Sequence, residues 1–441
     1  MSYRRRLPRR EFLRRSAVLS AAAVAVPYVI PSGVLSAADS PGANDRIGIG
    51  AIGVGRQGGS LAGRLARAGA ARLVAVADVN IRRAEQMAAR LEAEAHQDYR
   101  KLLERDDVDA IVTATPDHWR ALVCIHACQA GKDVYAEKPM SLTIREGRLM
   151  VEATRKYGRV FQTGSQQRSA AANRRGCELI RNQRIGRLEK VIAHNYPSPW
   201  ECALPAQPVP EGLDWDMWCG PTEVVPYHAD LYAPRANPGW ISFRPYSGGE
   251  MTGWGSHGLD QVQWALGMDE SGPVEVWTEG EAFDPPTYTA PESRSRGDGM
   301  CRKPKVFFRY PGDIVMELGN GPAGGAVFVG EKGTVTIDRG ACKSDPPEIA
   351  QEPIEDDDIR LYESDDHLGN WLECIKTREK PVADVEIGHR SATVCHLGNI
   401  ARRLGRRLRW DPVEETFIGD EEANTYLDRP RRKLYQLPEP V

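Results

Sequence analysis

The sequence predicts an α/β fold in which a doubly wound parallel sheet is followed by an α+β domain with a mostly antiparallel sheet. A glycine-rich turn, Gly53–Gly58, joins a short apolar strand to a helix near the start of the chain. Strands and helices of matching length then alternate as far as Thr163, which is typical of parallel sheets. Beyond residue 303, apolar strands follow one another through glycine-rich turns, as an antiparallel sheet requires.

Residues 1–38 have the features of a leader that is not part of the fold. Arg9 and Arg10, followed by Glu-Phe-Leu, resemble a twin-arginine (Tat) export signal, and a modestly apolar stretch leads to small residues at Ser36–Ala38. The apolar stretch is short and Pro27 interrupts it, so we expect cleavage or loose tethering rather than a membrane anchor. The sequence therefore predicts a periplasmic or exported protein that the Tat export machinery recognises.

Composition sets further bounds. The 441 residues are 41% hydrophobic, enough for two domains beyond the leader. The whole chain has a net charge of -3, and the leader holds seven arginines against one glutamate, which leaves the remainder near -9. An acidic body argues against nucleic-acid binding. The nine cysteines are scattered without C-x-x-C spacing, so we expect neither a disulfide framework nor a cysteine metal site.

The glycine-rich turn is the first candidate site. Ile47 and Ile49 belong to a buried strand, and Leu61 and Leu65 follow at helical spacing. Between them, G-x-G-x-x-G provides a tight turn, a close approach for a pyrophosphate, and close packing of helix on strand. The helix N-terminus offers N–H groups to phosphate oxygens. Alone, the motif also fits a plain strand–helix turn. The residues expected to contact a dinucleotide here are Gly53, Gly55, Arg56, Gln57 and Gly58.

A second strand, Arg72–Ala77, ends at Asp78, where an acid commonly binds the ribose hydroxyls of NAD. A carboxylate at this place repels the 2′-phosphate of NADP, so NAD is favoured. Arg82 and Arg83 would soften that repulsion, although we expect both on the solvated face of the next helix. The alternative role for Asp78 is that of a helix N-cap.

The alternation continues through helices at 84–95, 119–130 and 144–157 and strands at 109–113, 133–136 and 159–163. Polar motifs follow two of these strands, Thr115-Pro116-Asp117-His118 and Glu137-Lys138-Pro139. Ligands of doubly wound sheets bind outside the carboxyl ends of the strands. The glycine turn, Asp78 and both motifs fall at such ends, and together they favour a dinucleotide site.

With Glu137-Lys138-Pro139, the chain resembles the Gfo/Idh/MocA oxidoreductases, which include glucose-fructose oxidoreductase and inositol dehydrogenases. The resemblance extends to the glycine turn, Asp78, Thr115-Pro116, GSQQR at Gly164–Arg168, and Gly248–Asp260. It implies a Rossmann domain at 44–165, a substrate-binding and oligomerisation domain with a large open sheet at 166–410, and a tail at 411–441. NAD and substrate are expected between the two domains. Beyond the glycine turn and Asp78, the cofactor contacts expected are Thr115, Pro116, Asp117, His118, Glu137, Lys138 and Gln166.

Lys138 is the first candidate catalytic residue. The resemblance implies that it contacts both the nicotinamide and the reacting hydroxyl. The chemistry supports such a lysine independently, because oxidation of an alcohol needs a group that takes the hydroxyl proton as hydride leaves. A cationic ring nearby and partial desolvation lower the pKa of a lysine toward that task. The alternative is a surface lysine at a strand end.

His257 is the second candidate catalytic residue. In related dehydrogenases this block contains D-x-x-x-H, whose aspartate and histidine cooperate with the lysine. Here the aspartate position is Gly253, while His257 remains and Asp260 follows one turn later. Histidine titrates near neutrality and can act as acid or base, although a helix-cap or core histidine is the alternative. The missing aspartate puts a simple dehydrogenase mechanism in doubt, and Arg120 stands where relatives often place a histidine near the cofactor.

The second half begins with an expected helix at 174–181 and a strand at 188–195. A tract with Trp200, Trp215, Trp218 and Trp240 follows, and these rings are expected either to stack on a sugar or to pack a long loop. The substrate contacts expected are Lys138, Arg168, Trp200, His257 and Asp260. Later strands are expected at 306–310, 314–318, 326–329 and 334–337, and helices at 367–376 and 390–404. Asp366 and His367 have no third ligand at a telling spacing, so no metal site is predicted.

The sequence therefore predicts an exported oxidoreductase that acts on a sugar, polyol or glycoside and keeps NAD tightly bound, since free NAD is scarce outside the cytoplasm. The alternative enzyme is an NAD-dependent glycoside hydrolase, in which a transient oxidation acidifies the neighbouring C–H, the aglycone is eliminated and the hydride returns. A cofactor-binding sensor is the third hypothesis. From the resemblance, we also expect a homo-oligomer.

Overall fold

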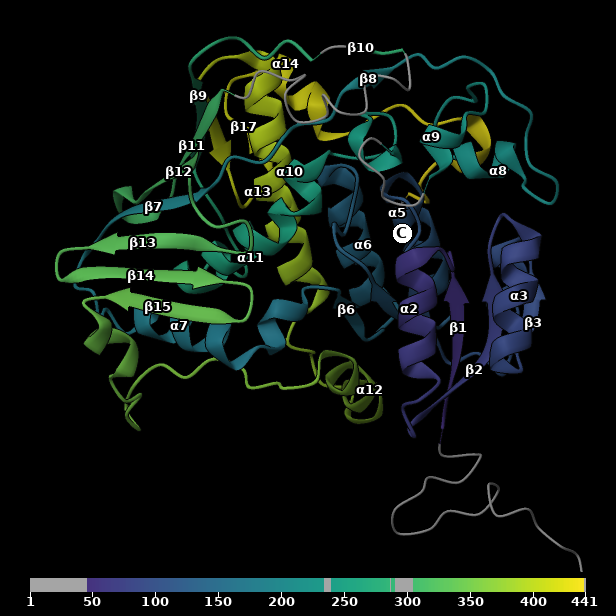
Figure 1. The fold of residues 1–441 in the computed structure, drawn as a ribbon, viewed down its shortest axis with the longest axis horizontal. Helices are drawn as coiled ribbons and strands as arrows, with labels where there is room; N and C mark the ends of the chain where they lie inside the picture. Colours follow the sequence, from purple (N-terminus) through teal and green to yellow (C-terminus); the bar gives the residue numbers. More distant parts are fainter. Residues whose placement is uncertain (1–45, 234–238, 286, 290–303, 440–441) are drawn as a thin grey trace, which may run out of the picture. The chain divides into compact units, whose positions relative to one another are not determined.

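The computed structural model describes residues 46–233, 239–285, 287–289 and 304–439 (Figure 1). The leader expected at 1–38 lies outside the described residues. Every element discussed below belongs to one compact unit, Ile47–Val441. Within the described ranges, no helix is both long enough and apolar enough to cross a membrane.

The first sheet confirms the predicted doubly wound fold. Six strands pair in parallel in the order β3-β2-β1-β4-β5-β6. The order reverses between β1 and β4, so ligands are expected at the carboxyl ends there. The strands are β1 (Ile47–Ile52), β2 (Ala71–Ala77), β3 (Glu94–His96), β4 (Ala110–Thr113), β5 (Asp133–Ala136) and β6 (Phe161–Thr163). The helices are α2 (Arg56–Leu65), α3 (Ile81–Leu91), α4 (Tyr99–Leu103), α5 (Asp117–Gln129) and α6 (Ile144–Lys156).

One element of this half differs from the prediction. The helix expected at 84–95 ends at Leu91, and β3 occupies its last residues. Glu92 follows the helix in the left-handed region, at φ 54°, which turns the chain back toward the sheet edge. The sequence did not predict this end of the helix, because the left-handed residue after a helix is usually glycine or asparagine, and here it is glutamate.

The second sheet has nine strands in the order β15-β14-β13-β7-β12-β11-β9-β16-β17. Only β7 and β12 pair in parallel, and the other neighbours are antiparallel, which confirms a mostly antiparallel sheet. The strands are β7 (Leu188–His194), β9 (Glu275–Glu279), β11 (Lys305–Arg309), β12 (Val315–Gly319), β13 (Ala326–Gly330), β14 (Gly333–Asp338), β15 (Ala341–Asp345), β16 (Leu408–Asp411) and β17 (Thr416–Phe417). A separate short pair consists of β8 (Glu201–Cys202) and β10 (Thr287–Tyr288).

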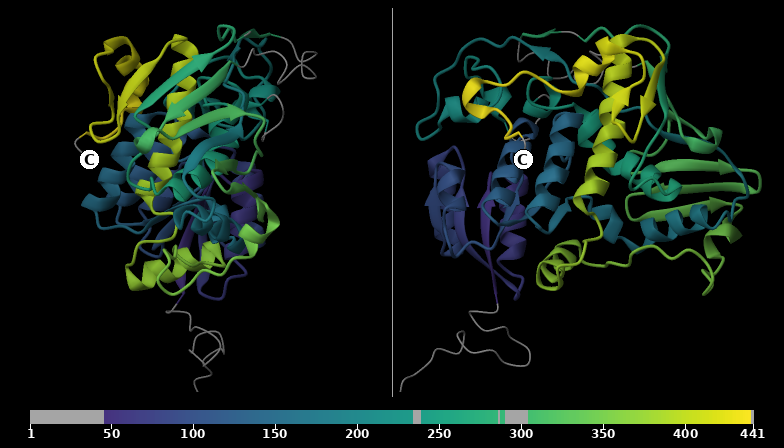
Figure 2. Two further views of the ribbon diagram at one scale, coloured as in Figure 1. Left: turned by 90° about the vertical axis from the view of Figure 1, so that its left-hand side faces the viewer. Right: turned by 180° about the vertical axis from the view of Figure 1, so that it is seen from behind.

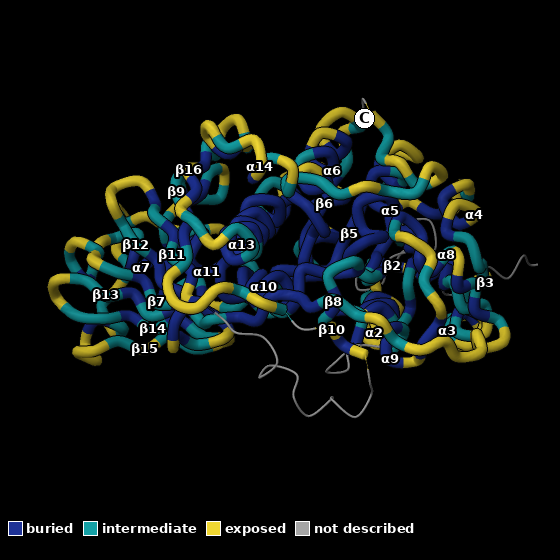
Figure 3. The backbone as a smooth tube through the Cα atoms, turned by 90° about the horizontal axis from the view of Figure 1, so that it is seen from above, coloured by how far each residue is buried: buried dark blue, intermediate teal, exposed yellow. Residues whose placement is uncertain are grey.

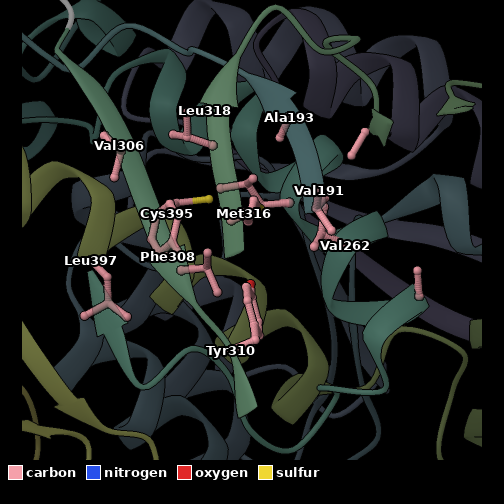
Figure 4. Packing of buried hydrophobic residues seen from close by; sticks show 14 of the residues in the cluster. Val191, Ala193, Val262, Val306, Phe308, Tyr310, Met316, Leu318, Cys395 and Leu397 are labelled. Atoms are coloured by element: carbon pink, nitrogen blue, oxygen red, sulfur yellow. The ribbon is translucent and has the colours of Figure 1, made fainter. Parts of the chain in front are cut away.

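Helices α7 (Ala171–Arg181), α11 (Gly255–Leu266) and α13 (Val385–Leu404) pack on one face of this sheet. Alternate strand residues such as Val191, Phe308 and Met316 point into the core they share, where they meet Val262 of α11 and Leu397 of α13 (Figure 4). Burial of alternate residues is what a sheet covered on one face produces. Figure 3 shows the resulting helices α11 and α13 as largely buried.

Two late helices return to the first sheet and join the halves. Trp371 of α12 (His367–Thr377) is fully buried and meets Tyr135 of β5 edge to face, with ring centroids 5.6 Å apart. The first turns of α13 place Val385 and Ala392 in the core beside α5 and α6, while its later turns pack on the second sheet. Figure 2 shows α13 running between the two sheets. The halves therefore share one framework.

Arg168 and Asp260, which were predicted to contact substrate, form a buried ion pair within this framework. Arg168 Nε donates to Asp260 Oδ1 at 2.9 Å, and the side chains of both are about 1% exposed. Ser391 Oγ of α13 donates to the same carboxylate oxygen at 2.8 Å, and Arg168 Nη2 also donates to Asp269 (2.7 Å). A buried charge needs a close partner, and here the two candidates neutralise each other. The pair joins α11 and α13 to the chain after β6.

Trp200, another predicted substrate contact, is also buried. The irregular chain between β7 and β9 contains α8 (Trp215–Cys219), α9 (Ala229–Tyr232) and α10 (Glu250–Gly253). Trp200, Trp215 and Trp218 are 3%, 7% and 3% exposed and form a cluster with Phe243 and Tyr246. Aromatic packing therefore stabilises this long tract, and Trp200 belongs to that packing.

Three buried histidines predict how stability depends on pH. The Nε2–H groups of His118, His367 and His396 donate to backbone carbonyls at 2.9, 3.0 and 3.2 Å. Burial lowers the pKa of His118 and His367 to about 4 and of His396 to about 3. Because the folded pKa lies below the unfolded value, their contribution is complete above about pH 6.5 and is lost as the pH falls.

We therefore expect the free energy of unfolding, measured in urea, to decrease between pH 6.5 and 5 by about 1.4 kcal/mol per pH unit for each histidine. The variant His118→Gln keeps a donor for the Trp218 carbonyl and should remove the contribution of one histidine to this pH dependence. Equal stability of the native chain at pH 7 and pH 5 would contradict the expectation.

Candidate functional site

One pocket of about 270 Å³ lies at the carboxyl ends of β1, β2, β4 and β5 and is closed by residues of the second half. The predicted site residues that line it are Gly53, Gly55, Arg56, Gln57, Asp78, Thr115, Pro116, Glu137, Lys138, Gln166 and His257. Met217, Trp218, Tyr232, Trp240, Ile241 and Arg339 line it from the second half. The tertiary structure thus brings most of the candidates into one space.

The glycine turn has the geometry that its sequence predicts. Gly53 has φ +76°, and a Cβ there would stand 2.9 Å from the Thr115 side chain. A Cβ on Gly58 would stand 2.0 Å from the Gly53 carbonyl oxygen, so helix α2 can approach β1 only because residue 58 is glycine. The Cβ position of Gly55 is open, and its nearest neighbour is Arg83 Nη1 at 4.0 Å. Gly58 therefore supports the turn from behind, while Gly55 faces the pocket.

Asp78 lines the pocket at the end of β2 and is 6% exposed. Its carboxylate accepts the N–H of Val54 at 3.0 Å and the N–H of Asn80 at 2.9 Å. Burial raises the pKa of this carboxyl, while the nearby Arg83 guanidinium and the two N–H groups oppose the rise. The N-cap of α3 is Asn80, whose side chain accepts from Arg83 N, so Asp78 does not serve as the cap.

Glu137 connects the strand end after β5 to the glycine turn. Its Oε1 accepts from Gln57 Nε2 and from Gln166 Nε2, both at 2.8 Å. Gln166 Nε2 also donates to Tyr135 Oη at 3.1 Å. Since these amides hold a carboxylate that is only 3% exposed, Glu137 is a positioning residue that orients the first turn of α2.

Lys138 reaches across the pocket to the second half. Its Nζ donates to the Gly253 carbonyl at 3.0 Å. His257, two residues into α11 and 5% exposed, lines the same pocket. An amine and an imidazole that line one pocket are groups that can take or donate a proton there.

Glu250 occupies the space that a side chain at position 253 would need. A Cβ on Gly253 would stand 2.7 Å from Glu250 Oε2 and 3.0 Å from Ile241 Cδ1. Both residues belong to α10, one helical turn apart, so the carboxylate of Glu250 lies where an aspartate at 253 would begin. A side chain at position 253 would therefore require the Glu250 carboxylate to move.

Asp117 and His118 were expected to contact the cofactor, but neither lines the pocket. Asp117 is fully buried, accepts from Ser247 Oγ at 2.7 Å and pairs with Arg120 at 3.1 Å. His118 packs between the rings of Trp218 and Tyr246. Both join α5 to the second half. Arg120, in contrast, lines the pocket and donates to the carbonyls of Thr115 and Pro139, so it ties two strand-end loops together.

A clamp that the sequence did not indicate packs on the chain that follows Asp78. We define it as Gly212–Asp214 together with Tyr232. The Gly212 carbonyl accepts from Ile81 N at 2.9 Å, and Asp214 N donates to the Val79 carbonyl at 3.0 Å. Asn80 Nδ2 donates to Tyr232 Oη at 3.3 Å, and the Arg83 guanidinium lies 5.1 Å from the centre of the Tyr232 ring.

Arg83 was expected on a solvated helix face, and this prediction is wrong. It lines the pocket, with its Nη1 at 3.5 Å from Asp78 Oδ2. In the sequence, the only indication that Arg83 lies at the pocket was its position five residues after Asp78. No sequence pattern identified the clamp, because its contacts join residues more than a hundred positions apart. Among the residues that the structure describes, no cluster of three or more His, Cys, Asp or Glu side chains is placed to hold a metal ion.

Comparisons with known proteins match both halves of the chain. Residues 47–165 match the description "Oxidoreductase family, NAD-binding Rossmann fold", and residues 188–437 match "Oxidoreductase family, C-terminal alpha/beta domain" of the Gfo/Idh/MocA type. An inositol 2-dehydrogenase from Rubrobacter xylanophilus is 39% identical over 129 residues, 29% of this chain and 37% of that protein. A glycosyl hydrolase family 109 protein from Shewanella baltica is 30% identical over 94 residues, 21% of this chain and 17% of that protein.

The solved structures show the same fold over a larger part of the chain. The WlbA dehydrogenase from Bordetella pertussis, in complex with NADH and UDP-GlcNAcA, has a TM-score of 0.57 at 20% identity and covers 83% of this chain and 99% of that chain. The matched regions span less than half the length of the curated relatives. The family matches, in contrast, cover both halves, and the C-terminal match alone covers more than half of the chain. The chain therefore belongs to the Gfo/Idh/MocA family of oxidoreductases, and its first half is an NAD-binding Rossmann domain.

Proposed function

We propose that the chain is an exported NAD-dependent oxidoreductase that removes hydride from a hydroxyl-bearing carbon of a sugar, polyol or glycoside. The observation that carries the proposal is the shared pocket, which is lined by the dinucleotide-binding turn, Lys138 and His257. The names of the relatives, an inositol 2-dehydrogenase and a dehydrogenase bound to a sugar nucleotide, support this class of substrate.

The residues at the sheet edge fit NAD. The open space at Gly55 leaves room for a pyrophosphate, and α2, ten residues long, starts there without a side-chain cap on its N–H groups. The Asp78 carboxylate at the end of β2 is suited to ribose hydroxyls and repels a 2′-phosphate. When bound, the nicotinamide ring supplies the hydride acceptor.

Lys138 would handle the proton of the substrate hydroxyl. Its Nζ, which lines the pocket and donates to the Gly253 carbonyl, would take that proton when the amine is in its neutral form. The ammonium that forms then makes a stronger, charge-assisted bond to the same carbonyl. His257, which lines the same pocket, would orient the hydroxyl or pass the proton on.

We further propose that the cofactor stays bound through many turnovers. The twin-arginine motif predicts export to the periplasm, where free NAD is scarce. The clamp supports retention, because Tyr232 lines the pocket while Gly212–Asp214 hold the chain that follows Asp78. The bound cofactor must then give the hydride back within each cycle or pass it to a second substrate.

A homo-oligomer is part of the proposal. The sheet face opposite α7, α11 and α13 carries partly exposed apolar side chains, among them Ile192, Phe307, Val327 and Val329. A second copy that covered these residues would remove them from water. Light scattering of the purified chain measures the assembly directly.

The second candidate is a glycoside hydrolase that uses NAD transiently. The match to a glycosyl hydrolase family 109 protein favours it, although this match covers only a fifth of the chain. Both reactions begin with the same hydride removal and need the same lysine. They differ in the product, since the hydrolase releases an aglycone without net NADH.

Replacing Lys138 by alanine should lower kcat by about 10²–10⁴-fold, because the proton acceptor is lost. The affinity for NAD should stay unchanged, since Gly55 and Asp78 are untouched. A screen of sugars, polyols and glycosides that records both NADH and aglycone measures the effect, with the exposed Lys376→Ala as the control. Undiminished turnover in Lys138→Ala would overturn the role of Lys138, and NAD binding without turnover in the native chain would favour the sensor.

Replacing Tyr232 by alanine should speed the release of NAD about tenfold, as expected when a contact worth about 1.4 kcal/mol is lost. NAD(H) should copurify with the native chain and be depleted in this variant. Tyr362→Ala serves as the control, because Tyr362 is 44% exposed and does not line the pocket. Equal release rates in the native chain and both variants would contradict retention by the clamp.

The coupling of positions 250 and 253 can be measured by a double-mutant cycle. Gly253→Asp alone should lower kcat by at least about tenfold, because the new side chain meets the Glu250 carboxylate. Adding Glu250→Gly removes the clash and should restore most of the activity. If the double variant is no more active than Gly253→Asp, Glu250 does not occupy the aspartate's place.

A further inference from the structure

A second cavity, of about 260 Å³, lies beside the loop that follows Lys138. Leu142 and Thr143 line it from that loop, residues between His396 and Arg403 from α13, and residues 425–430 from the C-terminal segment. In the described part of the chain, it shares no lining residue with the NAD pocket. The function proposed above leaves this cavity without a role.

Three arginines, Arg244, Arg403 and Arg429, line this cavity. Arg429 Nη1 donates to the Arg244 carbonyl, which brings the Arg429 side chain to the backbone of Arg244. Arg244 Nη1 and Arg403 Nη2 share one carboxylate oxygen of Glu201, at 3.8 and 3.4 Å. Among the described residues, no carboxylate forms an ion pair with Arg429. Three guanidinium groups thus face one cavity with one close carboxylate.

The other titratable groups at the cavity do not balance this charge. Asp428 lines it, but Arg431 takes both oxygens of that carboxylate, at 2.6 and 3.0 Å. Arg431 in turn pairs with Glu146 at 2.9 Å. His396 is neutral, because burial and then Arg429 lower its pKa to about 3. With Arg431 included, four guanidinium groups stand against the three carboxylates of Glu201, Asp428 and Glu146, so one positive charge remains in excess.

The crowding has a measurable electrostatic consequence. Burial, followed by repulsion from Arg244, lowers the pKa of Arg429 to about 10. Burial and Arg403 likewise lower the pKa of Arg244. Like charges held together in a partly dry cavity destabilise one another unless an anion joins them. The side chains of Arg244 and Arg403 are 34% and 30% exposed, so a small solute can reach them.

We propose that this cavity is a binding site for a small oxyanion, either free phosphate or the phosphate or carboxylate group of a metabolite, held by Arg244, Arg403 and Arg429. The planar guanidinium matches the oxygens of such groups in pairs, which makes arginine the usual ligand for them. The site does not depend on the proposed oxidoreductase activity, because it uses none of the residues of the NAD pocket.

To test this proposal, inorganic phosphate is titrated into the full chain. The chain is first saturated with NAD, so that phosphate cannot bind where the pyrophosphate of NAD binds. The melting temperature is followed against sodium chloride of equal ionic strength, and acetate is used in a parallel titration. We expect phosphate or acetate to raise the melting temperature in a saturable way, and chloride to give no such rise. The stronger of the two defines the class of ligand.

The variants decide whether the arginines are responsible. Arg403→Gln and Arg244→Gln should each raise the half-saturating concentration at least about tenfold, as expected when one charge-assisted contact is lost. Arg187→Gln, whose side chain is 73% exposed and lies outside the cavity, should leave it unchanged. Arg403 is the preferred target, since its partial exposure makes loss of folding a minor concern. No rise beyond that of chloride, or the same half-saturation in all variants, overturns the proposal.

Discussion

The hydrogen bond from Lys138 Nζ to the Gly253 carbonyl, 3.0 Å long, joins the two halves of the molecule where the chemistry is expected. Each end is held by a different part of the fold. Lys138 follows β5 of the parallel sheet, while Gly253 ends α10, whose approach is fixed where Asn399 of α13 donates to the Gly248 carbonyl at 2.8 Å. Since α13 packs against both sheets, the position of the amine depends on the packing of the whole framework.

The Rossmann half was predicted well because its signals are local. Gly53 and Gly58 are required by backbone contacts that their own neighbours impose, a left-handed turn and an approach of helix to strand. The carboxyl ends of parallel strands always meet at one edge, so Asp78, Thr115 and Lys138 had to lie near one another once the strands were recognised. The regular alternation of strands and helices therefore predicted most of the pocket.

The errors concern polar and aromatic residues that lie in or beside the functional motifs. Arg168 and Asp260, 92 positions apart, form a buried ion pair, and Asp117 bonds to Ser247 of the second half. Trp200 packs among other rings instead of facing a sugar. A motif shows only which residues are neighbours in the sequence. The direction of each side chain depends on the partner that satisfies its charge or packs against it.

The sequence by itself determined the order of the elements, the glycine turn of the NAD-binding domain and the candidate lysine, because periodicity, glycines and strand ends act over a few residues. Only the tertiary structure decided that Tyr232 contacts Asn80 and Arg83 beside the pocket, and that Glu250 fills the space beside Gly253. The same holds for the three arginines around one cavity. Such arrangements depend on distance, burial and charge between segments far apart in the chain, and these quantities exist only once the chain has packed.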